Sequence, residues 1–201
     1  MKTLPYKPYI AEIIGTFTLT LAVSLSLLGK VGALPTPLVA ATVLGLFVYT
    51  IGAISGAHLN PAVTLGLWSI KKINAQQAGL YIVSELIGAA VAMLVVGLFA
   101  FNQPAVTVNT DVTILAAETI GTFFLAFGVS SVVYGKVSDV ASGLVIGTSL
   151  LLGILIAAGL GSNGVLNPAV AFGIGSAGPM YLLGPIVGSI AAMQLYRWMA
   201  K

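Results

Sequence analysis

The sequence predicts an all-α membrane protein with an aquaporin-like arrangement: an inverted repeat of six transmembrane helices plus two half-helices that re-enter from opposite sides. Three observations support this fold class. Of the 201 residues, 58% are hydrophobic and only 6% are charged, whereas soluble domains carry about 25% charged residues. Runs of about 20 apolar residues, which a helix needs to cross a bilayer core of about 30 Å, recur along the chain. The chain also repeats itself, as described below.

Six apolar runs are long enough to span a membrane, and we expect them at residues 9–28, 37–54, 78–101, 112–134, 141–159 and 179–199. Two shorter apolar pieces, 60–70 and 167–175, are bounded by Gly, Ser and Asn. At 1.5 Å per residue each shorter piece reaches about 15 Å, which is half of a membrane. The sequence therefore predicts six spans and two half-helices.

An internal repeat relates the two halves of the chain. Residues 10–27 return as 116–133, with Glu12 matching Glu118, and residues 59–63 return as 166–170. Each copy contains three full spans, an odd number, so the second copy must enter the membrane upside down. We therefore expect one channel domain over 1–201, made of two inverted repeats at about 1–104 and 105–201. Such repeats place functional sites on broken helices at the midplane.

Both repeats contain the tripeptide Asn-Pro-Ala. Proline suits the first position of a helix, and an Asn before it is a favoured cap. Two such helix starts facing each other would bring two positive dipole ends to the midplane, which raises the energy of a cation but not of a neutral solute. The expected pore midplane residues are Asn60, Pro61, Ala62, Asn167, Pro168 and Ala169.

The paired motifs also carry a family resemblance. Residues 55–64 (SGAHLNPAVT) and 167–169 (NPA) resemble the two signature loops of the aquaporin and aquaglyceroporin (major intrinsic protein) family. Glu12 with residues 15–17 (GTF), and Glu118 with residues 121–123 (GTF), are similar to the first and fourth spans of that family. The resemblance covers nearly the whole chain. It implies a passive channel for water and small uncharged solutes, assembled as a homotetramer with one pore per subunit.

The resemblance also assigns roles to the buried polar residues. Glu12 and Glu118 are expected to accept hydrogen bonds from the backbone of the re-entrant loops, and are therefore structural. Glu85 lies where related channels commonly carry a glutamine, and its state is left open. His58 is expected to line the pore, either as a neutral ring or as a pH gate, because histidine titrates near neutrality. Further pore lining is expected from Gly161, Ser162 and Asn163.

The sequence departs from the family at the outer constriction. Most members follow the second Asn-Pro-Ala with an arginine, and here that residue is Val170. The family spacing, counted without gaps, places the other three positions of the constriction at Ala40, Leu155 and Gly164. A ring without arginine, histidine or an aromatic side chain leaves room for glycerol or similar small polyols, urea, ammonia or peroxide as well as water.

Basic residues indicate the orientation, because Lys and Arg in short loops accumulate on the cytoplasmic side. In a six-span arrangement only Lys30 falls on the opposite side from the other seven, which are Lys2, Lys7, Lys71, Lys72, Lys136, Arg197 and Lys201. A multi-pass protein of the cell membrane, surrounded by the lipid bilayer and with both termini cytoplasmic, is the expectation. Eight separated basic residues form no nucleic-acid patch, so no nucleic-acid partner is expected.

Two other function classes stay open at this stage. Inverted repeats with broken helices also build secondary transporters, and the missing arginine is compatible with an occluded-pore membrane scaffold. Coupled transport usually needs a charged site, for which Glu85 is the spare candidate. An enzyme is not expected, because the chain has no cysteine, one histidine and no carboxylate pair outside the apolar spans. No catalytic residue, cofactor or metal site is therefore assigned.

Overall fold

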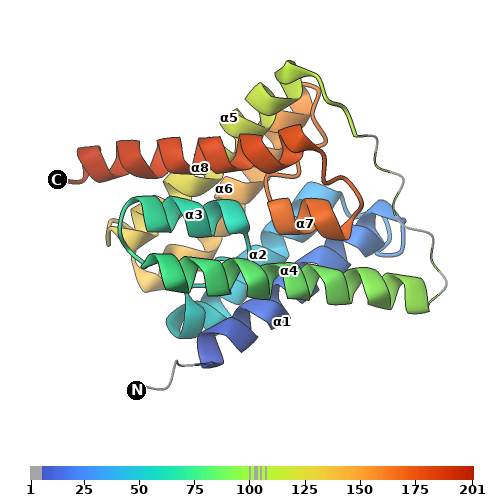
Figure 1. The fold of residues 1–201 in the computed structure, drawn as a ribbon, viewed down its shortest axis with the longest axis horizontal. Helices are drawn as coiled ribbons and strands as arrows, with labels where there is room; N and C mark the ends of the chain where they lie inside the picture. Colours follow the sequence, from blue (N-terminus) through green and yellow to red (C-terminus); the bar gives the residue numbers. More distant parts are fainter. Residues whose placement is uncertain (1–5, 100, 102–103, 105, 107) are drawn as a thin grey trace.

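The computed structural model describes residues 6–99, 101, 104, 106 and 108–201, and every regular element among them is an α-helix (Figure 1). Five helices are long and apolar enough to cross a membrane, and α8 occupies the place of the sixth although Pro185 and Gln194 make it less apolar. In chain order the helices are α1 (Lys7–Leu27), α2 (Thr36–Ser55), α3 (Pro61–Ser69), α4 (Ala75–Leu98), α5 (Val112–Val133), α6 (Asp139–Gly159), α7 (Pro168–Gly173) and α8 (Pro179–Met199).

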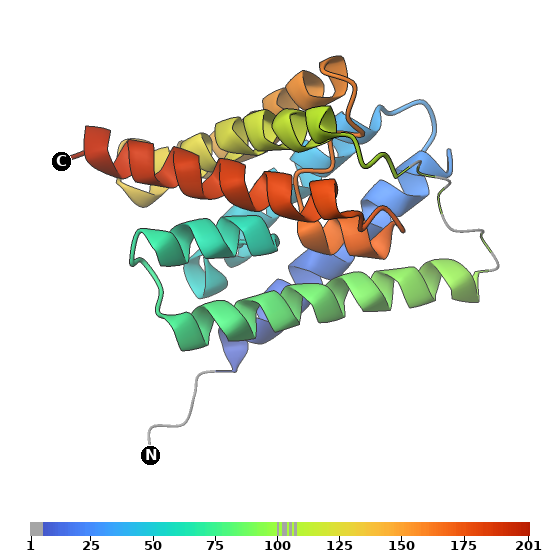
Figure 2. The same cartoon turned by 45° about the horizontal axis from the view of Figure 1, so that its top comes forward.

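The long helices pack in the same way in both halves of the chain. In the first half α1 packs against α4 and α2, and in the second half α5 packs against α8 and α6. The halves join where α2 packs on α6 and where each half-helix crosses over, α3 onto α8 and α7 onto α4 (Figure 2). The short helices α3 and α7 thus lie between long helices of both halves, with their starting ends toward each other.

Local sequence signals explain where the short elements begin. Asn60 and Asn167 cap α3 and α7 through their side-chain oxygens, and Pro61 and Pro168 occupy the first helical position, where a missing N–H costs nothing. Helix α4 begins at Ala75 rather than at residue 78 as predicted. A capping box formed by Asn74 and Gln77 adds this polar first turn, which a search for apolar residues overlooks.

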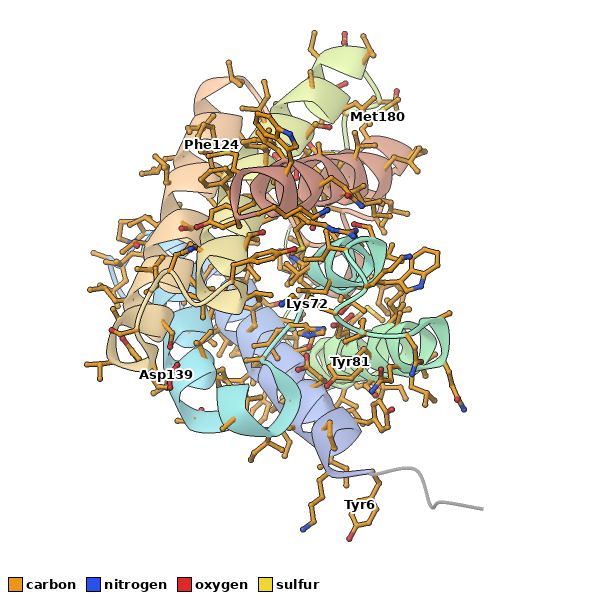
Figure 3. The ribbon with its side chains drawn as sticks, turned by 90° about the vertical axis from the view of Figure 1, so that its left-hand side faces the viewer. Tyr6, Lys72, Tyr81, Phe124, Asp139 and Met180 are labelled. Carbon is orange, nitrogen blue, oxygen red and sulfur yellow. The ribbon has the colours of Figure 1, made fainter. Side chains whose placement is uncertain are left out.

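The start of α1 and the end of α8 lie at the same end of the molecule, called here the side of the termini, together with the α3–α4 loop (Figure 1). Figure 3 looks onto that end and shows Lys72 between Asp139 and Tyr81. Lys72 reaches across to α5, where its Nζ donates to the Val133 carbonyl at 3.3 Å and lies 4.6 Å from the centroid of the Tyr134 ring. Lys2, one of the basic residues used to predict the orientation, lies outside the described residues.

Candidate pore

A cavity of about 720 Å³ lies between the helices of both halves. At the end opposite the termini it is lined by the start of α2 at Thr36 and by Asn163, and at the other end by Tyr49, Ser142 and Asp139. Apart from Asp139, none of the described residues along its wall is Asp, Glu, Lys or Arg. The cavity is therefore a largely uncharged path from one end of the molecule to the other.

The two Asn-Pro-Ala motifs meet midway along this path. Asn60 Nδ2 donates to the Leu166 carbonyl at 2.9 Å, and Asn167 Nδ2 donates to the Leu59 carbonyl at 2.8 Å. Their Oδ1 atoms accept from backbone N–H groups of their own helices, Ala62 at 2.9 Å and Ala169 at 3.0 Å. Each side-chain NH₂ carries two hydrogens, so one hydrogen of each amide is left for a molecule in the cavity.

The other four motif residues support the two asparagines rather than lining the cavity. Pro61, Ala62, Pro168 and Ala169 are buried, and both alanines are fully enclosed. Only the asparagines of the two tripeptides are among the cavity-lining residues. The tripeptides therefore act as two capped helix starts, each of which presents one amide to the path.

The backbone before each asparagine is held in an unusual conformation. Leu59 and its counterpart Leu166 have φ values of 50° and 55°, and Ala57 has 49° where its counterpart is Gly164 at 64°. A left-handed conformation in a residue other than glycine costs about 1–3 kcal/mol and persists only where surrounding contacts enforce it. Contacts with surrounding residues must therefore keep both loops in this backbone conformation.

Glu12 and Glu118, which match across the repeat, provide these contacts, as the resemblance implies. Glu12 is fully buried and accepts from the N–H groups of His58 at 3.0 Å and Leu59 at 2.7 Å. Glu118 is equally buried and accepts from Val165 at 3.0 Å and Leu166 at 2.7 Å. A carboxylate that receives two buried amides satisfies groups that otherwise have no partner at that depth.

Ser162 belongs to this support and not to the cavity wall. Its hydroxyl donates to Glu118 and accepts from the Gly164 N–H. Gly161, which was also expected to line the pore, is exposed, and neither residue contributes to the cavity. Of the three residues predicted in this loop, only Asn163 lines it.

Three of the four residues expected at the outer constriction line the cavity, and one does not. Ala40, Gly164 and Val170 line the cavity as predicted, but Leu155 is 55% exposed on the outer surface of α6. Ile154, which is 7% exposed, faces the cavity instead. Successive helical residues point about 100° apart, so a count without gaps that is off by one residue selects the wrong face. The ring of Ala40, Ile154, Gly164 and Val170 remains without a charge or an aromatic side chain.

The half of the cavity toward the termini carries a polar chain. His58 lines the cavity and packs its ring against Tyr81, with centroids 4.5 Å apart. Its Nδ1 lies 2.9 Å from the Thr64 hydroxyl, which donates to Glu85 Oε1 at 2.7 Å. Glu85 is fully buried on α4. The chain therefore runs from the cavity wall to an acid that has no contact with solvent.

Reasoning from the sequence did not find three of these residues. Ile154 was displaced by one position, and Asp139, which precedes the span expected at 141–159, was not singled out. Thr64 lies two residues after the first motif, but nothing in the sequence signals its contact with Glu85, which comes from the packing of α3 on α4. In the part of the chain that the structure describes, no three His, Cys, Asp or Glu side chains are grouped to hold a metal ion.

Comparisons with known proteins agree with this geometry. Residues 1–196 match the family described as Major intrinsic protein. The chain is 36% identical over 177 residues to the probable aquaporin AqpM of Archaeoglobus fulgidus, covering 77% of this chain and 71% of that protein. It is 33% identical over 172 residues to aquaporin NIP1-1 of Arabidopsis thaliana, covering 75% of this chain and 57% of that protein.

A solved structure has the same architecture. The X-ray structure of the aquaglyceroporin from Plasmodium falciparum matches with a TM-score of 0.72 and 25% identity, covering 94% of each chain. An internal path, paired capped half-helices and a multi-pass helical fold are those of a passive membrane channel for water and small solutes, not of an enzyme. By its sequence and its fold, the chain belongs to the major intrinsic protein family.

Proposed function

We propose that this channel conducts neutral solutes larger than water, such as glycerol or similar small polyols, in addition to water. The observation that carries the proposal is the outer ring of the cavity, where Val170, Ala40 and Gly164 leave a small and apolar lining. An arginine at residue 170 would occupy part of this ring and add a fixed charge. Its absence favours solutes that need width, including urea, ammonia and peroxide.

Exclusion of cations and protons is assigned to the midplane. The first-turn N–H groups of α3 and α7 and the free amide hydrogens of Asn60 and Asn167 all present positive potential to the path. A cation that has lost part of its hydration there is disfavoured, while water and hydroxyl groups can accept hydrogen bonds. This barrier is expected to work without the outer arginine.

We place the protein in the cell membrane as a homotetramer, with both termini cytoplasmic and with repeats that divide near 104/105. The orientation is supported by Lys71, Lys72 and Arg197, which belong to the loop and the helix end at the side of the termini. Large apolar side chains such as Leu94, Leu98 and Val140 are exposed on the outside of the helices. Lipid or neighbouring subunits would cover such surfaces.

The test is permeation into liposomes that contain the purified protein. Light scattering after osmotic shock is followed with sucrose and then with glycerol, while an internal dye reports pH. We expect fast shrinkage, fast glycerol re-swelling and no pH change. Glycerol exclusion would overturn the wide-channel proposal, a pH change would overturn the midplane barrier, and no acceleration over empty liposomes would overturn an open pore.

Variants at residue 170 separate charge from size. Val170→Arg should reduce glycerol flux by at least roughly tenfold, about 1.4 kcal/mol on the barrier, and should reduce water flux less. Val170→Leu is the matched control because it adds bulk without charge, and we expect it to retain most of the water flux. If Val170→Arg leaves glycerol flux unchanged, residue 170 is not at the constriction.

A further inference from the structure

The first half of the chain contains a buried acid that has no equivalent in the second half. Tyr81 and Gly88 repeat as Tyr181 and Gly188, which aligns Glu85 with Pro185. The motif repeat likewise aligns Thr64 with Ala171. Helix α7 therefore packs against its neighbours without a pair equivalent to Thr64 and Glu85. The packing of a half-helix does not require such a pair.

The Thr64 hydroxyl has only one hydrogen, which it donates to Glu85 Oε1 at 2.7 Å when Glu85 is a carboxylate. Toward His58 Nδ1, at 2.9 Å, the same oxygen can then only accept. Nδ1 must therefore carry the ring hydrogen of a neutral His58. Nε2 is left with a lone pair, and it makes no hydrogen bond to any of the described residues while His58 lines the cavity.

Neighbouring ionisable groups do not compete for this arrangement. Glu12 on α1 is engaged with the His58 and Leu59 N–H groups, and the Tyr81 hydroxyl donates to the Ser55 carbonyl at 2.6 Å. The second oxygen of Glu85, Oε2, is buried and meets no hydrogen-bond partner among the described residues. Glu85 is therefore linked to His58 through the Thr64 hydroxyl, and it also interacts with the backbone N–H of Asn60.

We propose that Glu85 is a positioning residue that, through Thr64, fixes the tautomer of His58 so that Nε2 presents a hydrogen-bond acceptor to the solute. Asn60 and Asn167 present donors at the midplane, and His58 adds an acceptor on the side of the termini. A molecule that both donates and accepts, such as a polyol or an amide, can then exchange partners along the path. This selectivity rests on the proposed conduction of neutral solutes, but the tautomer itself does not.

The tautomer can be measured directly because His58 is the single histidine of the chain. In protein labelled with ¹⁵N-histidine and reconstituted in lipid, protonated and unprotonated ring nitrogens give well-separated resonances. We expect the wild type to carry its hydrogen on Nδ1. A hydrogen on Nε2 in the wild type would overturn the proposal whatever the conduction assays show.

Four variants test the route through Thr64. Glu85→Leu removes the acceptor, so the Thr64 hydroxyl turns to donate to Nδ1 and the hydrogen moves to Nε2. Thr64→Val should abolish the single Nδ1–H state, and Thr64→Ser should keep it. Thr122→Val is the matched control, because it removes a buried hydroxyl that has no partner among the described residues of the second half, and it should leave the His58 spectrum unchanged.

Permeation connects the tautomer to selectivity. Losing or reversing one hydrogen bond to the solute should change glycerol flux relative to water by about two- to tenfold in Glu85→Leu and Thr64→Val. An Nδ1–H state retained in folded Glu85→Leu would overturn the role of Glu85. If Glu85→Leu does not fold, the contrast between Thr64→Val and Thr64→Ser decides, and equal spectra for those two variants would overturn the relay.

Discussion

The two re-entrant segments of this channel, residues 56–69 and 161–173, are held alike but present different chemistry to the pore. In each, a buried glutamate accepts two backbone amides, and an asparagine caps the half-helix and bonds to the opposite loop. The first segment continues into His58, Thr64 and Glu85. The second segment contributes Val170 and Gly164 to the cavity wall.

This difference separates the residues that hold the fold from the residues that select the solute. Positions that match across the repeat, such as Glu12 with Glu118, meet a need that both loops share, because each loop has buried amides at membrane depth. Positions that do not match, such as Glu85 opposite Pro185, cannot serve a requirement that both loops share. The unmatched polar residues lie on the side of the termini, and the unmatched apolar ones lie at the outer constriction.

The largest loss of stability is expected when the glutamate that supports either re-entrant loop is removed. Glu12→Leu and Glu118→Leu each leave two buried N–H groups without an acceptor, and about 1–3 kcal/mol per group predicts a loss of about 2–6 kcal/mol in the free energy of unfolding. The loss should be similar for the two variants, because each glutamate also interacts with a serine hydroxyl, Ser55 for Glu12 and Ser162 for Glu118. Thermal unfolding in detergent, followed by the fluorescence of Trp68 and Trp198, measures this effect.

Glu85→Leu is the matched control for that comparison. Glu85 is as deeply buried as the other two acids. It accepts from the Thr64 hydroxyl and interacts with one backbone N–H, that of Asn60, whereas each matched acid accepts from two. We expect a smaller drop in the unfolding midpoint than in either matched variant. An equal or larger drop would mean that Glu85 also supports the first re-entrant loop. Residues that stabilise the fold would then not be distinct from residues that select the solute.

An intermediate effect is expected where long helices cross in each half. A Cβ added to Gly88 would lie 2.5 Å from the Ile13 carbonyl oxygen, and one added to Gly188 would lie 2.1 Å from that of Thr119. Because both neighbours are backbone, Ala at either site must push two helices apart, at about 1–3 kcal/mol. Gly188→Ala should lower the unfolding midpoint more than Gly88→Ala does.

Gly79→Ala provides the control on the same helix as Gly88. No heavy atom lies within 4 Å of a Cβ at Gly79, so the change should stabilise α4 slightly, by up to about 1 kcal/mol. The same fluorescence measurement serves for all three glycine variants. Midpoints for Gly88→Ala and Gly188→Ala that match the wild type would show that the helices can separate without loss, contrary to the tight packing proposed for them.

Much of the architecture follows from the sequence because its causes are local. Apolar runs set the long helices, and Asn before Pro sets the starts of α3 and α7. The miss at Leu155 arose because the count without gaps was off by one residue, and one residue turns the side chain by about 100° onto another face of α6. The contact between Thr64 and Glu85 could not be predicted for a different reason: it joins two helices whose relative placement is decided by packing.

The smallest effect concerns how the first helix of each repeat begins. Helix α1 has no side-chain cap at Tyr6, whereas Asp111 caps α5 by accepting from the Thr113 N–H at 2.8 Å. Hydrogen bonds from the backbone and the hydroxyl of Thr113 lower the pKa of Asp111 below its ordinary value of 3.8. A lowered pKa means that the cap stabilises α5 above the ordinary value and is lost as the pH falls through the lowered one.

Asp111→Ala should therefore lower the unfolding midpoint slightly at neutral pH, and the difference from the wild type should vanish once the pH falls below the lowered pKa, where the carboxyl is protonated in both states. Asp111→Asn keeps a good cap without a charge that titrates, so its midpoint should lie close to that of the wild type and vary less with pH over this range. If Asp111→Ala unfolds like the wild type at neutral pH, α5 needs its cap no more than α1 does, and the start of the repeat is set by tertiary packing in both halves.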